Sequence, residues 1–429
     1  MEFRKLGEFC TVKGGKRLPK GTQLQESKTN HPYLRIKDFN NGNIDINNLM
    51  YISEEVFNKI SNYTINKGNI FLSIVGTIGL VDVIEEELDK SSLTENAVKI
   101  YSNDEKQLST EFLSYYLKST MGQHEIRIRT VGSTQPKLAI TRIKDINVPM
   151  IDIKKQYKIT WILSNIDKKI KLNRTIIANL EELSQTLFKR WFVDFEFPDE
   201  NGAPYKANGG EMTNSELGEI PKAWRVETLE KLGSIIGGGT PSKKNKEYYT
   251  NNGIPWITPK DLSKNRNIYI SHGENDISEL GLNKSSAKLL EKNSVLFSSR
   301  APIGYIAINN MPVTTNQGFK SIVPNEEMNP YFIYFILKNI TPLIEQTASG
   351  STFKEISAKG MKSIKIVFPS IELIKQYGNI VKKYFEEINF LENQNIKLIE
   401  LRDTLLPKLM SGELEIPDDV EVNTDELSI

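Results

Sequence analysis

The sequence predicts a mixed α/β (α+β) fold, in which two similar domains alternate with two long helices that pair as an antiparallel coiled coil. A segment over 153–192 returns in a second version over 371–410, and both copies carry Lys-Gln-Tyr near their start. The region that precedes each copy also recurs. Self-similarity on this scale indicates a repeat architecture, and two similar domains carried on antiparallel helices are expected to be related by an approximate two-fold axis.

Each repeated segment is predicted to form one long helix. Its seam residues follow alternating steps of three and four, which is the narrow spacing of a coiled coil. At about 1.5 Å per residue, roughly 40 residues give a rod of about 60 Å. The seams run through Ile166, Ile170, Asn173, Ile177, Leu180 and Leu187, with Ser184 as a weak position, and through Tyr384, Ile388, Leu391, Asn395, Leu398, Arg402 and Leu405.

The direction of the helix pair is predicted from one polar residue in each seam, because such a residue fixes register and orientation. An antiparallel arrangement lets Asn173 face Asn395. A parallel arrangement aligned by the repeat would set each asparagine against an aliphatic residue. We therefore predict antiparallel pairing, with two separate core helices as the alternative. The predicted pairing residues are Asn173, Ile177, Leu180, Ile388, Leu391 and Asn395.

The recurring pieces also place the domain boundaries. The linker between the halves is polar and turn-rich. The C-terminal segment has acidic residues and no basic ones, so it is interpreted as a solvated tail. We predict a first domain over 1–150, a first helix over 151–192, a linker over 193–222, a second domain over 223–370, a second helix over 371–412 and an acidic tail over 413–429.

Composition indicates an ordinary globular protein. The chain has 429 residues, a length that is enough for two or three domains. Of these residues, 38% are hydrophobic and 25% charged, and the net charge is +1. One cysteine, Cys10, excludes a disulfide framework and fits a reducing compartment. We see no apolar signal segment and no run of 18 apolar residues. These features predict a soluble cytoplasmic protein without a membrane partner.

The two domains share a frame of matched motifs. An approximate two-fold relation between two similar domains matches the symmetry of the DNA backbones. Because the loops of the halves differ in sequence, we expect two short, unlike half-sites with unread base pairs between them. The matched pairs are Pro32–Phe39 with Pro255–Leu262, Ile78-Gly79 with Ile303-Gly304, Phe112–Lys118 with Phe332–Lys338, and Gly132–Thr134 with Gly350–Thr352.

The order of these motifs resembles the specificity subunit of type I restriction–modification systems, over essentially the whole chain. The first half departs from the pattern, since Val75-Gly76-Thr77 stands where the second half has Arg300-Ala301-Pro302. Leu93–Asn96 likewise replaces the Thr-Asn-Gln motif, which argues against a shared contact chemistry in the two halves. The residues that carry the resemblance are Gly238–Pro241, Ile254–Ile257, Ser299–Gly304, Thr315–Gly318, Phe192–Pro198 and Leu217–Pro221.

The resemblance implies a non-catalytic, sequence-specific DNA-binding subunit with two target-recognition domains. It would read a bipartite, asymmetric site in double-stranded DNA. It would also recruit two methyltransferase (modification) subunits, which transfer a methyl group from S-adenosylmethionine to adenine. Motor-nuclease (restriction) subunits, dependent on ATP and Mg, would complete the complex. No cofactor is expected on this chain.

The residues themselves disfavour an enzyme. The chain has no Gly-x-x-x-x-Gly-Lys-Ser/Thr loop for ATP and no Asn-Pro-Pro or Asp-Pro-Pro aromatic motif of amino-methylating enzymes. Its three histidines lie far apart, and one cysteine cannot build a zinc site. We therefore predict no catalytic residue and no metal site. The alternatives are a scaffold that does not bind DNA, and a stand-alone nuclease or methyltransferase with an unrecognised site.

Candidate DNA contacts fall into three groups. The Gly-Ser-Thr loops offer amides, hydroxyls and a cation, which position phosphates and can reach bases. Lysines and an arginine after the Gly-rich turns would neutralise phosphates. The alternative for both groups is a solvated surface loop. The predicted DNA-binding residues are Lys16, Arg17, Lys37, Ser133, Thr134, Gln135, Lys137, Thr240, Ser242, Lys243, Lys244, Lys260, Arg300, Asn316, Gln317, Ser351, Thr352 and Lys354.

The third group could read bases directly. Arg300 could bind guanine bidentately, and Asn316 and Gln317 could read adenine. Internal hydrogen bonds that hold the loop are an equally good explanation of these residues. Tyr33 and Trp256 occupy matched positions, and we predict that they pack in the fold rather than stack on bases.

Overall fold

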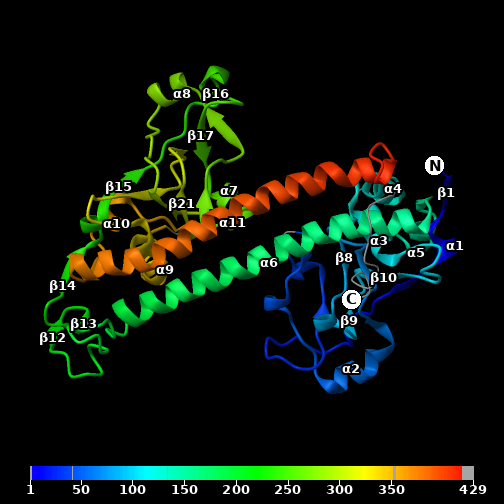
Figure 1. The fold of residues 1–429 in the computed structure, drawn as a ribbon, viewed down its shortest axis with the longest axis horizontal. Coiled ribbons are helices and arrows are strands. Elements are labelled where there is room, and N and C mark those ends of the chain that lie inside the picture. Colours follow the sequence, from blue (N-terminus) through cyan, green and yellow to red (C-terminus); the bar gives the residue numbers. More distant parts are fainter. Residues whose placement is uncertain (1, 41, 133, 351–353, 418–429) are drawn as a thin grey trace. The chain divides into compact units, whose positions relative to one another are not determined.

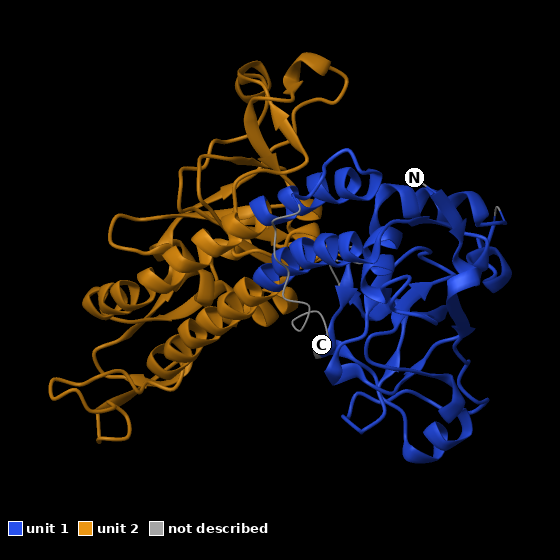
Figure 2. Ribbon diagram, turned by 45° about the vertical axis from the view of Figure 1, so that its right-hand side comes forward, with its two compact units in different colours: residues 1–170, 397–429 blue, residues 171–396 orange. Residues whose placement is uncertain are grey.

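The computed structural model describes residues 2–40, 42–132, 134–350 and 354–417. Two compact units make up the chain, residues 1–170 with 397–429, and residues 171–396 (Figure 2). Both long helices, α6 (Ile153–Phe192) and α11 (Ile371–Ser411), are divided between the two units, so that each unit contains a section of each helix. Among the described residues, none of the helices is both long and apolar enough to cross a membrane.

The first unit is mixed in secondary structure. Its main sheet has the order β2-β10-β7-β8 with antiparallel neighbours, and a smaller sheet has the order β3-β9-β6. The strands are β1 Glu2–Lys5, β2 Cys10–Gly14, β3 Tyr33–Leu34, β4 Phe39–Asn40, β5 Asn43–Ile44, β6 Thr64–Ile65, β7 Ile70–Ser73, β8 Val81–Val83, β9 Ser91–Leu93, β10 Ala97–Ser102 and β11 Asn147–Met150. The helices that precede α6 are α1 Leu6–Phe9, α2 Glu54–Ile60, α3 Thr110–Lys118, α4 Thr120–Arg129 and α5 Ile140–Lys144, with 3₁₀ turns η1 Ile36–Asp38, η2 Ile46–Asn48, η3 Ser61–Tyr63 and η4 Glu86–Leu88.

The second unit is also mixed, with a main sheet of order β15-β23-β20-β21-β18 and a smaller sheet of order β16-β19-β17-β22. The strands are β12 Met212–Ser215, β13 Gly218–Pro221, β14 Arg225–Thr228, β15 Gly233–Gly237, β16 Tyr249–Thr250, β17 Ile254–Ile257, β18 Tyr269–Ile270, β19 Asn275–Ile277, β20 Val295–Ser299, β21 Ile303–Asn309, β22 Thr314–Thr315, β23 Lys320–Pro324 and β24 Lys365–Phe368. The helices are α7 Pro259–Lys264, α8 Glu279–Asn283, α9 Pro330–Thr347 and α10 Ala358–Lys362, with 3₁₀ turns η5 Leu229–Leu232 and η6 Lys246–Tyr248.

The same topology therefore occurs twice, as the sequence repeat predicts. The antiparallel run β2-β10-β7-β8 corresponds to β15-β23-β20-β21. Each smaller sheet contains one parallel pair, β3 with β9 and β17 with β22. Figure 1 shows that α2 and β9 form a lobe set apart from α3, α4 and α5 in the first unit, as α8, β16 and β17 do from α9 and α10 in the second.

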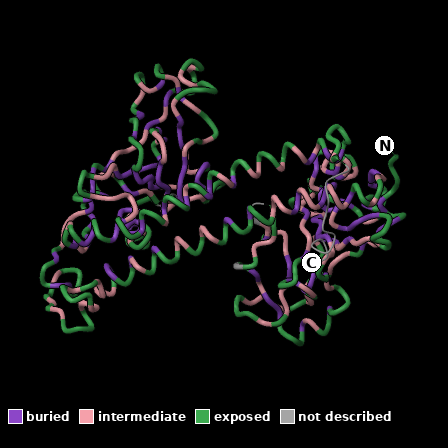
Figure 3. The backbone as a smooth tube through the Cα atoms, in the orientation of Figure 1, coloured by how far each residue is buried: buried purple, intermediate pink, exposed green. Residues whose placement is uncertain are grey.

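Each main sheet is covered by helices, and the cores are apolar. In the first unit Ile159 and Leu163 of α6 join the same core as Leu406 and Leu409 of α11. The second unit has an aromatic centre, in which Phe192 and Tyr377 make an edge contact with ring centroids 5.3 Å apart. In Figure 3 buried residues gather inside each unit, while buried and exposed positions alternate along the long helices, which is the pattern of an amphipathic helix.

The long helices run antiparallel. In the second unit Asn173 Nδ2 donates to Asn395 Oδ1 over 2.9 Å, and Tyr377 Oη donates to the carbonyl of Ser184 over 3.1 Å. As residue numbers increase along α6, the numbers of the residues that they contact on α11 therefore decrease. Ile177 and Leu180 pack against the core that contains Ile388, and Leu391 is buried as well.

One predicted seam residue has a different role from its neighbours. Arg402 lies in the α11 seam, but its Nη1 contacts Asp167 Oδ1 of α6 at 2.9 Å within the first unit. Tyr115 of α3 donates to Asp167 Oδ2 over 2.8 Å. A charged pair that is still in contact with solvent thus replaces apolar packing here, because α3 supplies the second partner.

The segment over 193–222 is packed rather than loose. Phe197 stacks between Tyr205 and Trp224, with ring centroids 4.6 and 5.1 Å away, and Phe195 meets Trp224 edge-on at 5.5 Å. The hairpin of β12 and β13 follows. The polar, turn-rich composition hides this cluster, because its few aromatic residues are dispersed along the segment. The predicted tail lies outside the described residues from 418 onward.

Candidate nucleic-acid interface

Successive glycines stand at the end of the first strand of each main sheet, Gly14-Gly15 at β2 and Gly237–Gly239 at β15. A Cβ on Gly15 would lie 2.1 Å from the carbonyl oxygen of Thr94, and one on Gly238 would lie 2.0 Å from that of Asn316. Only glycine allows this close approach. The Gly-rich turns thus hold their loops directly against the segments that follow β9 and β22.

A buried aromatic residue braces each of these two loops, which begin at Gly15 and Gly238, at the same place. Tyr33 Oη donates to the carbonyl of Lys16 over 2.8 Å, and Trp256 Nε1 donates to the carbonyl of Gly239 over 2.9 Å. Burial raises the pKa of Tyr33 to about 12, so its hydroxyl stays protonated and able to donate. The structure therefore places both aromatic residues in the fold at matched positions.

The residue that follows each braced carbonyl, Arg17 or Thr240, contacts the segment that follows β9 or β22. In the first unit Arg17 Nε lies 3.7 Å from Glu95 Oε1. In the second unit the hydroxyl of Thr240 donates to Gln317 Oε1. The frame is the same, but an ion pair in one half is replaced by a neutral hydrogen bond in the other.

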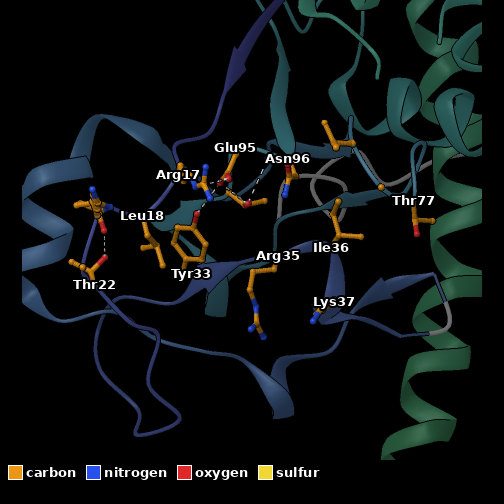
Figure 4. Close-up of a pocket in the computed structure, with 16 residues that line it drawn as sticks. Arg17, Leu18, Thr22, Tyr33, Arg35, Ile36, Lys37, Thr77, Glu95 and Asn96 are labelled. Atoms are coloured by element: carbon orange, nitrogen blue, oxygen red, sulfur yellow. Dashed lines mark hydrogen bonds and ion pairs between the residues drawn. The ribbon is translucent and has the colours of Figure 1, made fainter. Parts of the chain in front are cut away.

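A hollow of about 1110 Å³ lies beside the first braced loop (Figure 4). Its lining carries the cations of Arg17, Lys20, Arg35 and Lys37, with Glu95 as its carboxylate. Thr77 and Asn96 add a hydroxyl and an amide. The structure thus brings the predicted residues Arg17 and Lys37 together. Arg35, Thr77 and Asn96 are not among the predicted contacts, and Arg35 has no cationic counterpart at its matched position in the second half, which is Thr258.

Two predicted lysines at matched positions differ in their partners. Lys37 is exposed and makes no ion pair with any described residue. Lys260 Nζ lies 2.9 Å from Glu274 Oε2, which Lys264 approaches as well. The hydrogen bond that Lys260 donates to Glu274 raises the pKa of Lys260. Lys260 therefore stays charged, but part of its field is neutralised.

Unpaired lysines surround the second braced loop. Lys243 and Lys244, with Ser242, lie exposed after the Gly-rich turn. Gly239 touches Ser286 and Ala287 so closely that a Cβ would clash. The segment over 284–288 therefore adjoins this loop and adds Lys284 and Lys288, which are exposed and make no ion pair with described residues. The sequence gives no local sign of this proximity, because about 45 residues separate the two segments.

The candidate base-reading residues of the second unit are held by internal contacts. Arg300 Nη1 lies 3.2 Å from Glu355 Oε2, and Lys320 Nζ lies 3.6 Å from Glu355 Oε1. Asn316 Oδ1 accepts a hydrogen bond from the Gly318 amide over 2.8 Å. Internal hydrogen bonding, the alternative that the sequence leaves open, is thus present in the free protein. Lys320 and Glu355 also line a hollow of about 510 Å³.

Glu355 of the second unit corresponds to a residue of opposite charge, Lys137, in the first unit. Arg300 forms a β-bridge with Glu355, and Val75 forms the corresponding bridge with Lys137. Lys137 is exposed and has no ion-pair partner among the described residues. An arginine and a glutamate in one half therefore correspond to a valine and a lysine in the other.

The Gly-Ser-Thr loops fall only partly within the described residues. Gly132 and Gly350 have φ values of +100° and +128°, a region that favours glycine. Thr134 and Gln135 are exposed, and Lys354 Nζ donates to the carbonyl of Glu345 over 3.3 Å. The remaining predicted contacts, Ser133, Ser351 and Thr352, lie outside the described residues.

The described residues contain neither a cluster of metal ligands nor a reactive thiol. No group of three or more His, Cys, Asp or Glu side chains is arranged there to hold a metal ion. Cys10 is buried, and desolvation raises the pKa of its thiol to about 12, so it is not a reactive thiolate.

Comparisons with known proteins identify the family. The family model described as "Type I restriction modification DNA specificity domain" matches residues 1–182 and again residues 221–401. The Type I restriction enzyme MjaIX specificity subunit of Methanocaldococcus jannaschii is 39% identical over 186 residues, which cover 43% of this chain and 42% of that protein. The Type I restriction enzyme HindI specificity subunit of Haemophilus influenzae is 28% identical over 405 residues, covering 82% and 87% of the two chains.

A solved structure has the same fold. The S subunit of the type I restriction–modification system from M. genitalium superposes with a TM-score of 0.61 at 18% identity, over 95% of each chain. The two successive matches to the family model fall on the two structural repeats. The chain therefore belongs to the family of type I restriction–modification DNA specificity domains.

Proposed function

We propose that this chain reads one bipartite, asymmetric site in double-stranded DNA, with one half-site for each domain. The observation that carries the proposal is the braced loop, present in both units and surrounded by different side chains. Tyr33 and Trp256 hold the same carbonyl position. A repeated frame with unlike contact residues suits two unlike half-sites.

Phosphate contacts supply most of the affinity in this proposal. The unpaired cations Lys37 and Lys137 in the first unit, and Lys243, Lys244 and Lys284 in the second, are free of competing carboxylates among the described residues. Each phosphate that is neutralised releases counterions, so binding weakens steeply as salt rises. Such contacts position the protein without reading sequence.

Specificity then comes from the positions at which the halves differ. Arg300 can bind guanine bidentately once it leaves Glu355, and the amide of Gln317 can pair with adenine. The first half has Val75 and Glu95 at these two places. The two domains are therefore expected to recognise different bases.

The chemistry of the complex belongs to other subunits in this proposal. The chain is a DNA-recognition subunit, and we assign methyl transfer to two methyltransferase subunits that use S-adenosylmethionine. Cleavage is assigned to motor-nuclease subunits that use ATP and Mg. The support is that the named relatives are specificity subunits of type I restriction enzymes. Such a complex would act on cellular DNA in the cytoplasm.

The decisive experiment is methylation sequencing of host DNA with and without this gene. We expect adenine methylation at one bipartite motif to disappear with the gene. Unchanged methylation, combined with no salt-dependent DNA binding by the purified chain, would overturn the proposal and favour a scaffold that does not bind DNA. Methylation by the isolated chain with S-adenosylmethionine would instead overturn the assignment of chemistry to partners.

A further inference from the structure

Arg35 is a cation of the first unit that lies directly after β3 and lines the hollow beside the braced loop. Its side chain is 25% exposed, whereas that of Arg17 on the same hollow is 86% exposed. In Figure 4 the guanidinium of Arg35 points away from the contact between Arg17 and Glu95. Arg35 is thus a partly enclosed cation rather than a freely solvated one.

A buried carboxylate fixes the orientation of this guanidinium. Asp38, whose side chain is 1% exposed, accepts a hydrogen bond from the Arg35 amide at Oδ2 over 2.7 Å. Its Oδ1 accepts from Arg35 Nε over 3.1 Å and also from Nη2. Asp38 is the last residue of the turn η1, and it caps the turn by accepting from the amide of Arg35, the residue that precedes it. Among the described residues, Asp38 is the only hydrogen-bond or ion-pair partner of the Arg35 side chain.

These contacts use one edge of the guanidinium and leave the other available. Arginine has five N–H donors in a rigid fork. Asp38 occupies the edge that carries Nε, so Nη1 and the second hydrogen of Nη2 remain for a ligand. That edge matches the two acceptors O6 and N7 of guanine in the major groove. A side chain already held in position loses little conformational freedom on binding.

We propose that Arg35 is a specificity-determining residue that reads a guanine in the half-site of the first domain. The inference rests on the proposed function and deepens it. Arg17, which is far more exposed, suits a phosphate, and Lys37 has no rigid fork. Arg35 alone in this hollow combines an enclosed guanidinium with a buried carboxylate that orients it.

The second unit has the same capping arrangement without the arginine, at the start of the helix α7. Asp261 Oδ2 accepts from the Thr258 amide over 2.7 Å and from the Thr258 hydroxyl over 2.6 Å. Thr258 stands where the first unit has Arg35, as Asp261 stands for Asp38. The turn is therefore compatible with threonine, and guanine reading from this position is confined to one half-site.

The test uses the full chain in its host, with the substitution Arg35→Thr and methylation sequencing as the readout. We expect methylation to spread to sites with other bases at a single G·C pair in one half-site, while the other half-site stays strictly read. Discrimination at that pair should fall about 5- to 150-fold, the factor that corresponds to about 1–3 kcal/mol for one bidentate contact. The matched control is Arg4→Thr, since Arg4 also pairs with a nearby carboxylate, that of Glu8, but does not line the hollow.

A second variant separates recognition from folding and from charge. Arg35→Lys keeps the cation and loses the fork, so it should lose discrimination at the same base pair while the salt dependence of DNA binding stays unchanged. This variant remains informative even if Arg35→Thr lowers the melting temperature of the protein.

Three results would overturn the inference. These are a first half-site without a G·C pair, unchanged specificity in both variants, and a uniform loss of affinity for all sequences, which would indicate a phosphate contact. In each case the wild type would still methylate a bipartite motif, so the proposed function would stand. The absence of any such motif in the wild type would overturn the proposed function itself.

Discussion

Asn173 of α6 donates a hydrogen bond to Asn395 of α11 in the buried seam of the helix pair, with 2.9 Å between Nδ2 and Oδ1. The same Nδ2 also donates to Gln394 Oε1 over 2.7 Å. Buried polar pairs of this kind specify register more than they add stability. Asn173 Oδ1 is itself buried without a partner among the described residues.

Replacing one member of this pair should therefore cost more than replacing both. Asn173→Leu leaves the buried amide of Asn395 unsatisfied, so we expect the free energy of unfolding to fall by about 1–3 kcal/mol. Replacing both asparagines by leucine should be nearly neutral, because the one acceptor that loses its donor, Gln394 Oε1, belongs to a half-buried side chain that water can reach. Urea unfolding of the two single variants and the double variant measures this. A double variant that loses the sum of the single losses would show that the two side chains are not coupled.

This pair also shows why the helices were predictable. Spacing in steps of three and four fixes which residues share a seam, and one asparagine in each seam fixes the direction. Contacts with the domains were not predictable in the same way. Arg402 sits at a seam position but pairs with Asp167, because Tyr115 from α3 orients that carboxylate, and nothing in the helix sequence reports the position of α3.

Glu392 should make the second unit sensitive to pH. Its carboxylate accepts hydrogen bonds from the amides of Ile268 and Tyr269 over 2.7 and 3.0 Å. Burial is the main cause that raises its pKa to about 8, with the Glu181 carboxylate acting in the same direction. Because the folded protein holds this proton more tightly than the unfolded chain, stability should fall as pH rises from about 4.5 through about 8.

The measurement is urea unfolding at several pH values across this range. Each unit of pKa shift is linked to about 1.4 kcal/mol, so the wild type should lose a few kcal/mol. Glu392→Gln cannot ionise, and we expect it to flatten this part of the profile. Glu387→Gln, on an exposed face of the same helix, should leave the wild-type profile intact. A profile that is equally steep in all three proteins would assign the pH dependence to other groups.

Glu355 should restrain the cations of the second domain. It contacts Arg300 at 3.2 Å and Lys320 at 3.6 Å, whereas the first unit has Lys137 at the corresponding bridge. Glu355→Gln removes the negative charge and frees both cations. Affinity for non-specific DNA should rise, and the slope of log K against log salt should steepen by about 0.9 for each additional phosphate that is neutralised.

Fluorescence anisotropy titrations at several salt concentrations measure that slope. Glu211→Gln is the matched control, because Glu211 also pairs with a lysine, Lys222, but lies in the segment between the domains. Equal slopes in the wild type and in Glu355→Gln would contradict the expectation, since the freed cations would then face no phosphate.

The candidate site was predictable where its residues adjoin a motif and was missed where folding assembles it. Arg17 could be predicted because it follows a Gly-rich turn, and Lys37 because a lysine, Lys260, occupies the matched position in the second half. Lys284 and Lys288 could not, because the contact of Gly239 with Ser286 and Ala287 brings their segment to the loop. Glu355 was missed for the same reason, since a β-bridge pairs it with a strand end 55 residues earlier.

Lys284 and Lys288 offer a direct test of this assembled surface. Replacing both by glutamine should weaken DNA binding by a similar factor for specific and unrelated sequences, because phosphate contacts carry no sequence information. The salt slope should become shallower by about 0.9 for each phosphate that is no longer neutralised, while the methylated motif stays the same. Lys231→Gln is the control, an exposed lysine that precedes β15 and makes no ion pair with described residues. A changed motif in the double variant would show that these lysines read bases, and unchanged binding would show that the segment over 284–288 lies outside the DNA interface.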